Sequence, residues 1–127
     1  MNVYKGNMWK NGEKIHLSYL LDKIPDNKWD WYLYEIDAVG VAPRNMSMLD
    51  FEQQALSCDT GLKLTWDEVK SFANTLDDIK TFFLAALMMP VQHSVIGNGD
   101  SSYCFASIGV TDSTSWEIKL IKTQVLK

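Results

Sequence analysis

The chain has few of the residues that grip phosphate or bind metal ions. Among its 127 residues there is one arginine, Arg44, and there are only two histidines and two cysteines. Arginine is the usual bidentate partner of phosphate, so a single arginine argues against direct binding of nucleic acid. The histidines and cysteines are far apart and no Cys-x-x-Cys motif occurs, so no spacing indicates a metal site. We expect no metal and no cofactor.

Long apolar runs and targeting signals are also lacking. The longest strongly apolar run, residues 82–89, is much shorter than the ~18 residues that a membrane-spanning helix needs. The first residues show no signal-peptide pattern. We therefore expect a cytoplasmic protein with no membrane partner, in which Cys58 and Cys104 are reduced and buried.

Catalytic motifs are absent from the sequence. It has no Gly-x-Ser-x-Gly nucleophile motif, and its glycine-rich stretch leads into a predicted strand instead of a helix. Paired carboxylates remain, and Glu35 and Asp37 share one face of a predicted strand by its two-residue period. A glycosidase-type acid/base pair could be built from such residues, although no motif sets their spacing. We expect that the protein is not an enzyme.

What the chain does contain is core-forming residues and an acidic middle. Hydrophobic residues make up 46% and aromatic residues 12% of the sequence, which is enough for one folded domain over residues 1–127. The net charge is −4, but residues 26–78 carry eleven acids against four cations, a local balance of 4 − 11 = −7. An acidic surface repels phosphate backbones and attracts basic partners.

The strongest local pattern is a helix start at Thr65. Thr65 is a typical N-cap residue, and Glu68 can return a hydrogen bond to the backbone of the cap. The apolar positions that follow are Trp66, Val69, Phe72, Ala73 and Leu76. Their spacing of three and four predicts an amphipathic helix. A weaker cap at Ser47 predicts a second, short helix that ends near Ser57.

Strands are predicted where aromatic and branched residues dominate. Residues 29–41 predict one or two strands. The run 79–89, stopped by Pro90, predicts a central buried strand, with a continued helix as the alternative. Residues 103–110 and 115–121 predict an antiparallel hairpin, because apolar and polar residues alternate in the second segment. The fold class we predict is α+β, a mostly antiparallel sheet with about two helices packed on one side.

Three further segments are less distinct. Asn11-Gly12 predicts an N-terminal hairpin. Residues 15–21 fit a strand by alternation and a helix face by three-and-four spacing, and we favour the strand. We expect an exposed turn at Asp77 and Asp78, because acids suit the C-terminal end of a helix poorly, and a loop at residues 97–102.

Several short patterns together resemble a known family. They are Ile24-Pro25-x-x-Lys28-Trp29-x-Trp31-x-Leu33-Tyr34, Met48-x-x-Phe51-Glu52, Gly61-Leu62-x-Leu64-x-Trp66-Asp67-Glu68 with Phe72-Ala73, and Asp112-Ser113-x-x-Trp116-Glu117. In this order they are similar to bacterial immunity proteins, more narrowly to those encoded beside contact-dependent growth inhibition toxins. The resemblance implies a small acidic cytoplasmic inhibitor that binds a cognate toxin domain, often a basic nuclease, and occludes its active site. The tryptophans in these patterns then belong to the scaffold.

Because such families recognise their toxins through variable surfaces, we choose candidate contacts by charge and expected exposure. The acids that we expect to contact the partner are Glu35, Asp37, Asp50, Glu52, Asp59, Asp77 and Asp78. Two alternatives remain open. One is a small-molecule-binding or enzymatic domain that uses an aromatic surface at Trp29–Tyr34 and nearby carboxylates. The other is a scaffold subunit whose exposed apolar strand pairs with another chain.

Overall fold

The computed structural model describes residues 2–97 and 102–121. Its strands are β1 (Asn2–Asn7), β2 (Trp9–Lys10), β3 (Glu13–Lys14), β4 (Asp30–Gly40), β5 (Leu62–Leu64), β6 (Leu76–Leu87), β7 (Cys104–Thr111) and β8 (Ser115–Leu120). Its helices are α1 (Leu17–Leu21), α2 (Met48–Ser57), α3 (Trp66–Ala73) and α4 (His93–Gly97).

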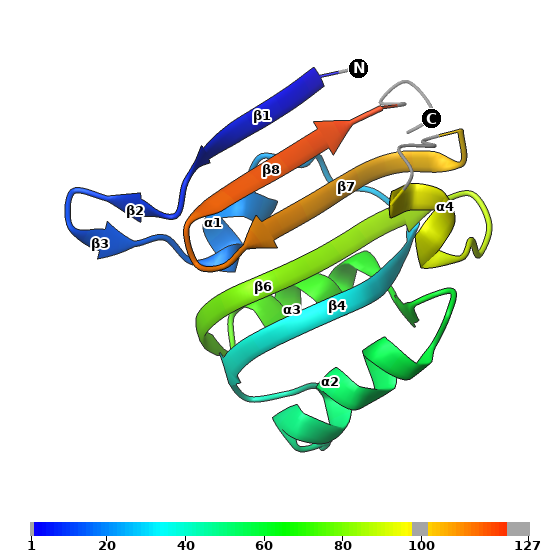
Figure 1. Cartoon of the computed structure of the whole chain (residues 1–127), viewed down its shortest axis with the longest axis horizontal. Coiled ribbons are helices and arrows are strands. Elements are labelled where there is room, and N and C mark those ends of the chain that lie inside the picture. Colours follow the sequence, from blue (N-terminus) through cyan, green and yellow to red (C-terminus); the bar gives the residue numbers. More distant parts are fainter. Residues whose placement is uncertain (1, 98–101, 122–127) are drawn as a thin grey trace.

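Six of the strands form one antiparallel sheet in the order β1-β8-β7-β6-β4-β5 (Figure 1). The long strands β4 and β6 lie next to each other in it. Strands β2 and β3 form a separate hairpin around the Asn11-Gly12 turn, which projects from one end of the sheet. The α+β class and the hairpins at both ends of the chain are as predicted.

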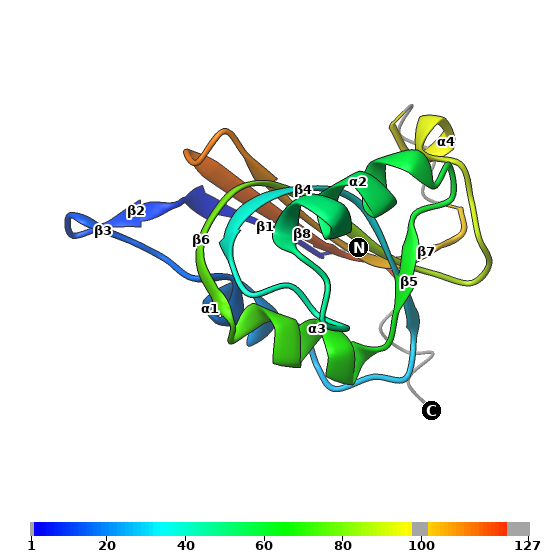
Figure 2. The same ribbon diagram turned by 90° about the horizontal axis from the view of Figure 1, so that it is seen from below.

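Two helices cover one face of the sheet (Figure 2). α3 begins with the predicted capping box, in which the Thr65 hydroxyl accepts from the Glu68 N–H at 3.1 Å and the Glu68 carboxylate accepts from the Thr65 N–H at 3.0 Å. The apolar face of α3 and the leucines of α1 meet Trp31 and the other inward side chains of the sheet in the main core. This core fixes the curvature of the sheet and the place of its opposite face.

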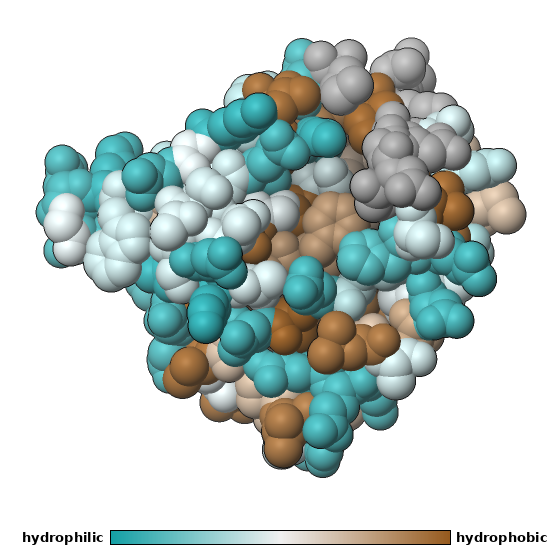
Figure 3. Space-filling view, in the orientation of Figure 1, coloured by the Kyte–Doolittle hydropathy of each residue, from teal (hydrophilic) through white to brown (hydrophobic). Residues whose placement is uncertain are grey.

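Residues 2–97 and 102–121 cover the opposite face of the sheet only at one end. Helix α4 lies there, and its residues Val95 and Ile96 pack on a smaller cluster that includes Tyr34, Leu87 and Cys104. Figure 3 looks onto this face and shows hydrophobic surface in the middle with hydrophilic side chains around it. Beside α4, no described helix covers this face of the sheet (Figure 1).

Residues 17–21 form helix α1, so the strand prediction for 15–21 was wrong. Leu17, Leu20 and Leu21 are buried while Tyr19 is exposed, which is the periodicity of a helix face. The helix is favoured because those three leucines join the main core.

The predicted turn at Asp77 and Asp78 was also wrong, because both residues lie in strand β6. α3 ends at Ala73, and the Thr75 hydroxyl bonds to the carbonyls of Val41 and Phe72 at 2.7 and 2.8 Å. These bonds turn the chain two residues earlier than expected. Strands β1 and β5 and helix α4 were not predicted. Of the loop expected at 97–102, residues 98–101 lie outside the described residues.

None of the helices in the described ranges combines the length and the apolarity that crossing a membrane requires.

Candidate functional site

Helix α2 lies along β4 (Figures 1 and 2). Phe51 and Ala55 are its buried residues. The Phe51 ring makes an edge contact with the ring of Phe72 on α3, with 5.1 Å between the ring centroids. The Glu52 carboxylate accepts a hydrogen bond from the Ala38 N–H at 3.0 Å, where the register of β4 shifts. Glu52, a predicted partner contact, thus also joins α2 to the sheet.

The outward side of α2 is partly apolar. Leu49 and Leu56 are seven residues apart, so they share one helix face, and they are 62% and 64% exposed. The predicted cap is present, since the Ser47 side chain accepts from the Asp50 N–H at 3.1 Å. Asp50, a predicted contact, is exposed beside Leu49. Exposed apolar residues with a polar rim are typical of interaction surfaces.

Strand β4 presents two of the predicted acids on the open face of the sheet. Glu35 is in register with Phe83 and Asp37 with Thr81, while Ile36 between them is buried in the main core. A bulge at residue 34 precedes them. Both carboxylates are exposed, as expected from the two-residue period.

Glu35 and Asp59, which are distant in the sequence, line the same hollow. This hollow has a volume of about 410 Å³ and is also lined by Leu56 and His93. The backbone of the two sides is linked, because the His93 N–H donates to the Asp59 carbonyl at 3.0 Å. The hollow therefore joins the C-terminal end of α2, strand β4 and the start of α4 into one surface.

Tyr34 forms the base of this region. It is 3% exposed, and its hydroxyl donates to the Val91 carbonyl at 2.5 Å. Burial raises the pKa of this hydroxyl well above its ordinary value, so Tyr34 stays neutral and serves as a packing residue. The His93 ring stacks on the Tyr34 ring with 5.0 Å between their centroids, and its centroid lies 5.6 Å from that of the Phe83 ring.

The acids of β4 and α2 have little cationic compensation. Between residues 35 and 59 the sequence has five acids and a single cation, Arg44. Arg44 pairs with Glu68 at 2.9 Å, across the cap of α3. No ion pair within the described part of the chain involves Glu35, Asp37 or Asp59, and the same is true of Asp50. We name the surface formed by Glu35, Asp37, Leu49, Asp50, Leu56 and Asp59 the acidic face.

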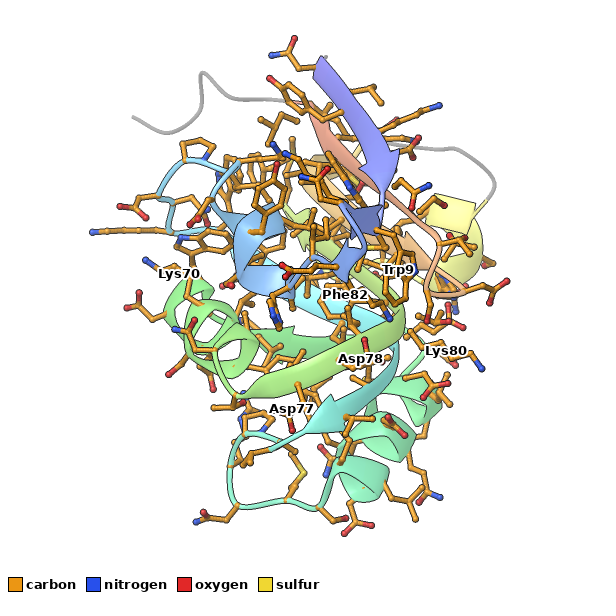
Figure 4. The ribbon with its side chains drawn as sticks, turned by 90° about the vertical axis from the view of Figure 1, so that its left-hand side faces the viewer. Trp9, Lys70, Asp77, Asp78, Lys80 and Phe82 are labelled. Atoms are coloured by element: carbon orange, nitrogen blue, oxygen red, sulfur yellow. The ribbon has the colours of Figure 1, made fainter. Side chains whose placement is uncertain are left out.

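Asp77 and Asp78 lie apart from the acidic face, at the start of β6 (Figure 4). Asp78 pairs with Lys14 of the N-terminal hairpin at 2.6 Å. The hydrogen bond from Lys14 holds the pKa of this carboxyl below its ordinary value. Asp77 is exposed and has no ion pair with a described residue. Lys80, on the same strand, points to the side of the sheet that carries α4.

The segment Trp29–Tyr34 forms no aromatic surface, so the surface on which the alternative ligand-binding function relies is buried. Trp29 and Trp31 are buried, as is Trp66, which stacks on Trp31 at 5.1 Å. The Trp31 ring N–H donates to the Asn27 side chain at 3.0 Å. The tryptophans belong to the scaffold because they lie in the main core, where β4 is flanked by β6 and β5.

Of the two cysteines, only one is buried as expected. Cys104 lies in the smaller cluster, whereas Cys58 is exposed in the turn after α2. The Cys58 thiol lies 3.0 Å from the Gly61 carbonyl, which it can reach because the chain turns back toward β5 there.

The sequence reasoning missed Leu49, Leu56 and His93. The two leucines had a signal, because they fall outside the helical stripe of Met48, Phe51 and Ala55 and are therefore exposed. His93 had none, since its place beside Glu35 depends on a chain reversal after β6.

No group of three potential metal-ligating side chains occurs among residues 2–97 and 102–121. Comparisons of the chain with protein-family models, with curated proteins and with solved structures found no match.

Proposed function

We propose that this protein is a cytoplasmic immunity protein that binds a basic toxin domain and neutralises it by covering its active site. The observation that carries the proposal is the acidic face, on which four exposed carboxylates have no ion pair with a described residue. The resemblance of the sequence to immunity proteins supports the same function.

The mechanism follows from charge and shape. Uncompensated carboxylates attract a basic domain over a distance and raise the association rate, most strongly at low salt. Leu49 and Leu56 then supply apolar contact area in the centre of the acids, and the hollow at Glu35 and Asp59 admits a protruding side chain. The inhibitor needs no catalytic group of its own, because it acts by occlusion.

The test is a binding measurement with the toxin domain encoded by the reading frame next to this gene. Isothermal calorimetry at 50 and 300 mM salt is expected to give nanomolar binding that weakens at the higher salt, since the Debye length falls below about 10 Å. The double variant Glu35→Gln, Asp59→Asn should bind more weakly. The matched control is Asp22→Asn, an exposed acid at the end of α1 on the other side of the sheet. The absence of binding at 50 mM salt would overturn the proposal.

A further inference from the structure

A second and larger hollow lies on the open face of the sheet, with a volume of about 770 Å³. One row of residues crosses it over five strands in register: Glu35, Phe83, Gly109, Glu117 and Lys5. Glu35 and His93 line this hollow and the one at Asp59 alike, so the two hollows are continuous at these residues. Volumes of this size are typical of ligand sites.

Gly109 leaves the middle of the row empty. Its backbone does not require glycine by conformation, and an added Cβ would meet the Phe83 ring and the Phe82 carbonyl at ordinary distances of 3.8 and 3.9 Å. Glycine weakens a strand interior and often marks the close approach of another molecule. Here it leaves one side of the Phe83 ring uncovered within the hollow.

Ser107 places an unpartnered hydroxyl at the floor of the same hollow. The residue is 9% exposed, and it faces the hollow because its neighbours Ala106 and Ile108 point into the main core. Within the described part of the chain this hydroxyl has no hydrogen-bond partner, and it is not among fully buried polar atoms that lack one. Its oxygen is therefore accessible from the hollow, where it can donate or accept a hydrogen bond with a group that enters from outside.

The charges of the hollow are uneven. At the β1–β8 end, the Nζ atoms of Lys5 and Lys119 form ion pairs with the Glu117 carboxylate at 3.5 and 3.6 Å. At the other end, Glu35 has no cation beside it and is the cross-strand neighbour of Phe83, on which His93 packs. Three strand spacings, roughly 14 Å, separate Glu35 from Glu117, so the lysines do not neutralise Glu35. An incoming cation is therefore attracted to Glu35 and repelled from the far end.

We propose that this hollow receives an arginine residue of the basic partner, with its guanidinium on Glu35, its aliphatic stem over Gly109 and its main chain at Ser107. Strand spacing and rise place Glu35 and Ser107 roughly 12 Å apart, which an extended arginine residue spans with a hydrogen bond at each end. A guanidinium suits the Glu35 end because it pairs with a carboxylate and stacks on aromatic rings. The inference rests on the proposed function and locates a contact that determines partner specificity.

The probe is blocked arginine, N-acetyl-arginine-N-methylamide, titrated into the full chain and followed by amide NMR. We expect saturable shifts at the amides of Phe83, Ser107 and Gly109. Blocked citrulline, which has the same shape without the charge, should give none. Glu35→Gln should weaken the binding about tenfold or more. The matched variant Asp22→Asn, an exposed acid at the end of α1 outside this hollow, should leave it unchanged. Equal shifts with citrulline, or shifts confined to α2, would overturn the assignment.

A second variant separates this inference from the proposed function. Gly109→Val fills the hollow, and a thermal melt checks that it folds. If the partner domain binds the wild type but binds Gly109→Val equally well, the arginine site is wrong and the immunity function stands. If blocked arginine binds as expected while the partner domain does not, the proposed function is wrong and the hollow takes a free guanidinium ligand instead of a partner side chain.

Discussion

Replacing Phe51 with alanine tests how α2 is held against the sheet. Phe51 is fully buried, and α2 buries only one other residue, the small Ala55. Removal of a buried phenylalanine ring costs about 3–5 kcal/mol, because it combines lost burial with a cavity. The edge contact with Phe72 at 5.1 Å places Phe51→Ala in the middle of that range, at about 4 kcal/mol.

The effect is large enough to measure by three methods. With an unfolding entropy of about 0.27 kcal/mol/K for a chain of this length, a loss of about 4 kcal/mol lowers the Tm by about 15 °C. Amide hydrogen exchange should also become faster in α2 than in β6, since the helix loses its main anchor while the central sheet remains. Urea denaturation gives the free energy of unfolding directly.

The control is Leu49→Ala, in the same helix but 62% exposed. It should change the free energy of unfolding by no more than about 0.5 kcal/mol. A loss below about 1 kcal/mol for Phe51→Ala, or an equal loss for both variants, would refute the reasoning that one ring anchors α2.

Two further predictions concern local electrostatics and capping. Thr65→Ala removes the capping box of α3 and should cost about 1 kcal/mol, or about 4 °C in Tm by calorimetry, whereas Thr65→Ser should be close to wild type. Asp78 has a lowered pKa in the folded protein, so its pair with Lys14 stabilises the fold above pH ~4 and this stabilisation is lost as the pH falls through the lowered value. Urea midpoints should therefore show Asp78→Asn less stable than wild type at pH 7 and equal to it near pH 2, and a difference independent of pH would contradict this.

Local signals were sufficient for the elements whose ends are set by neighbouring residues. The caps at Ser47 and Thr65 were both found, because each forms a hydrogen bond within three residues. The strand at residues 30–40 was also found, since aromatic and branched residues suit a central strand whatever its partners are.

Elements that depend on tertiary contacts were not predictable in the same way. Residues 17–21 fit two periodicities equally well, and the choice is made by burial of Leu17 and Leu20 in the main core. The short edge strands β1 and β5 are set by pairing with β8 and β4.

The candidate site was predictable only in part. The acidic residues were found from charge alone, but no local signal brings Glu35 and Asp59 to one hollow or leaves Ser107 unpartnered beside Gly109. These arrangements depend on the position of α4, which follows β6, and on how the residues of neighbouring strands pair across the sheet. The aromatic segment was left open as a possible surface because sequence composition does not distinguish a buried strand from an exposed one.

The most direct test of the central claim is to titrate the activity of the neighbouring toxin domain with this protein at 150 mM salt. Wild-type protein is expected to abolish the activity at one equivalent. The variant that neutralises the acidic face (Glu35→Gln, Asp37→Asn, Asp50→Asn, Asp59→Asn) should leave most of the activity, provided that its thermal melt shows a folded protein. Full toxin activity with excess wild type, or equal inhibition by the neutralised variant, would contradict the account.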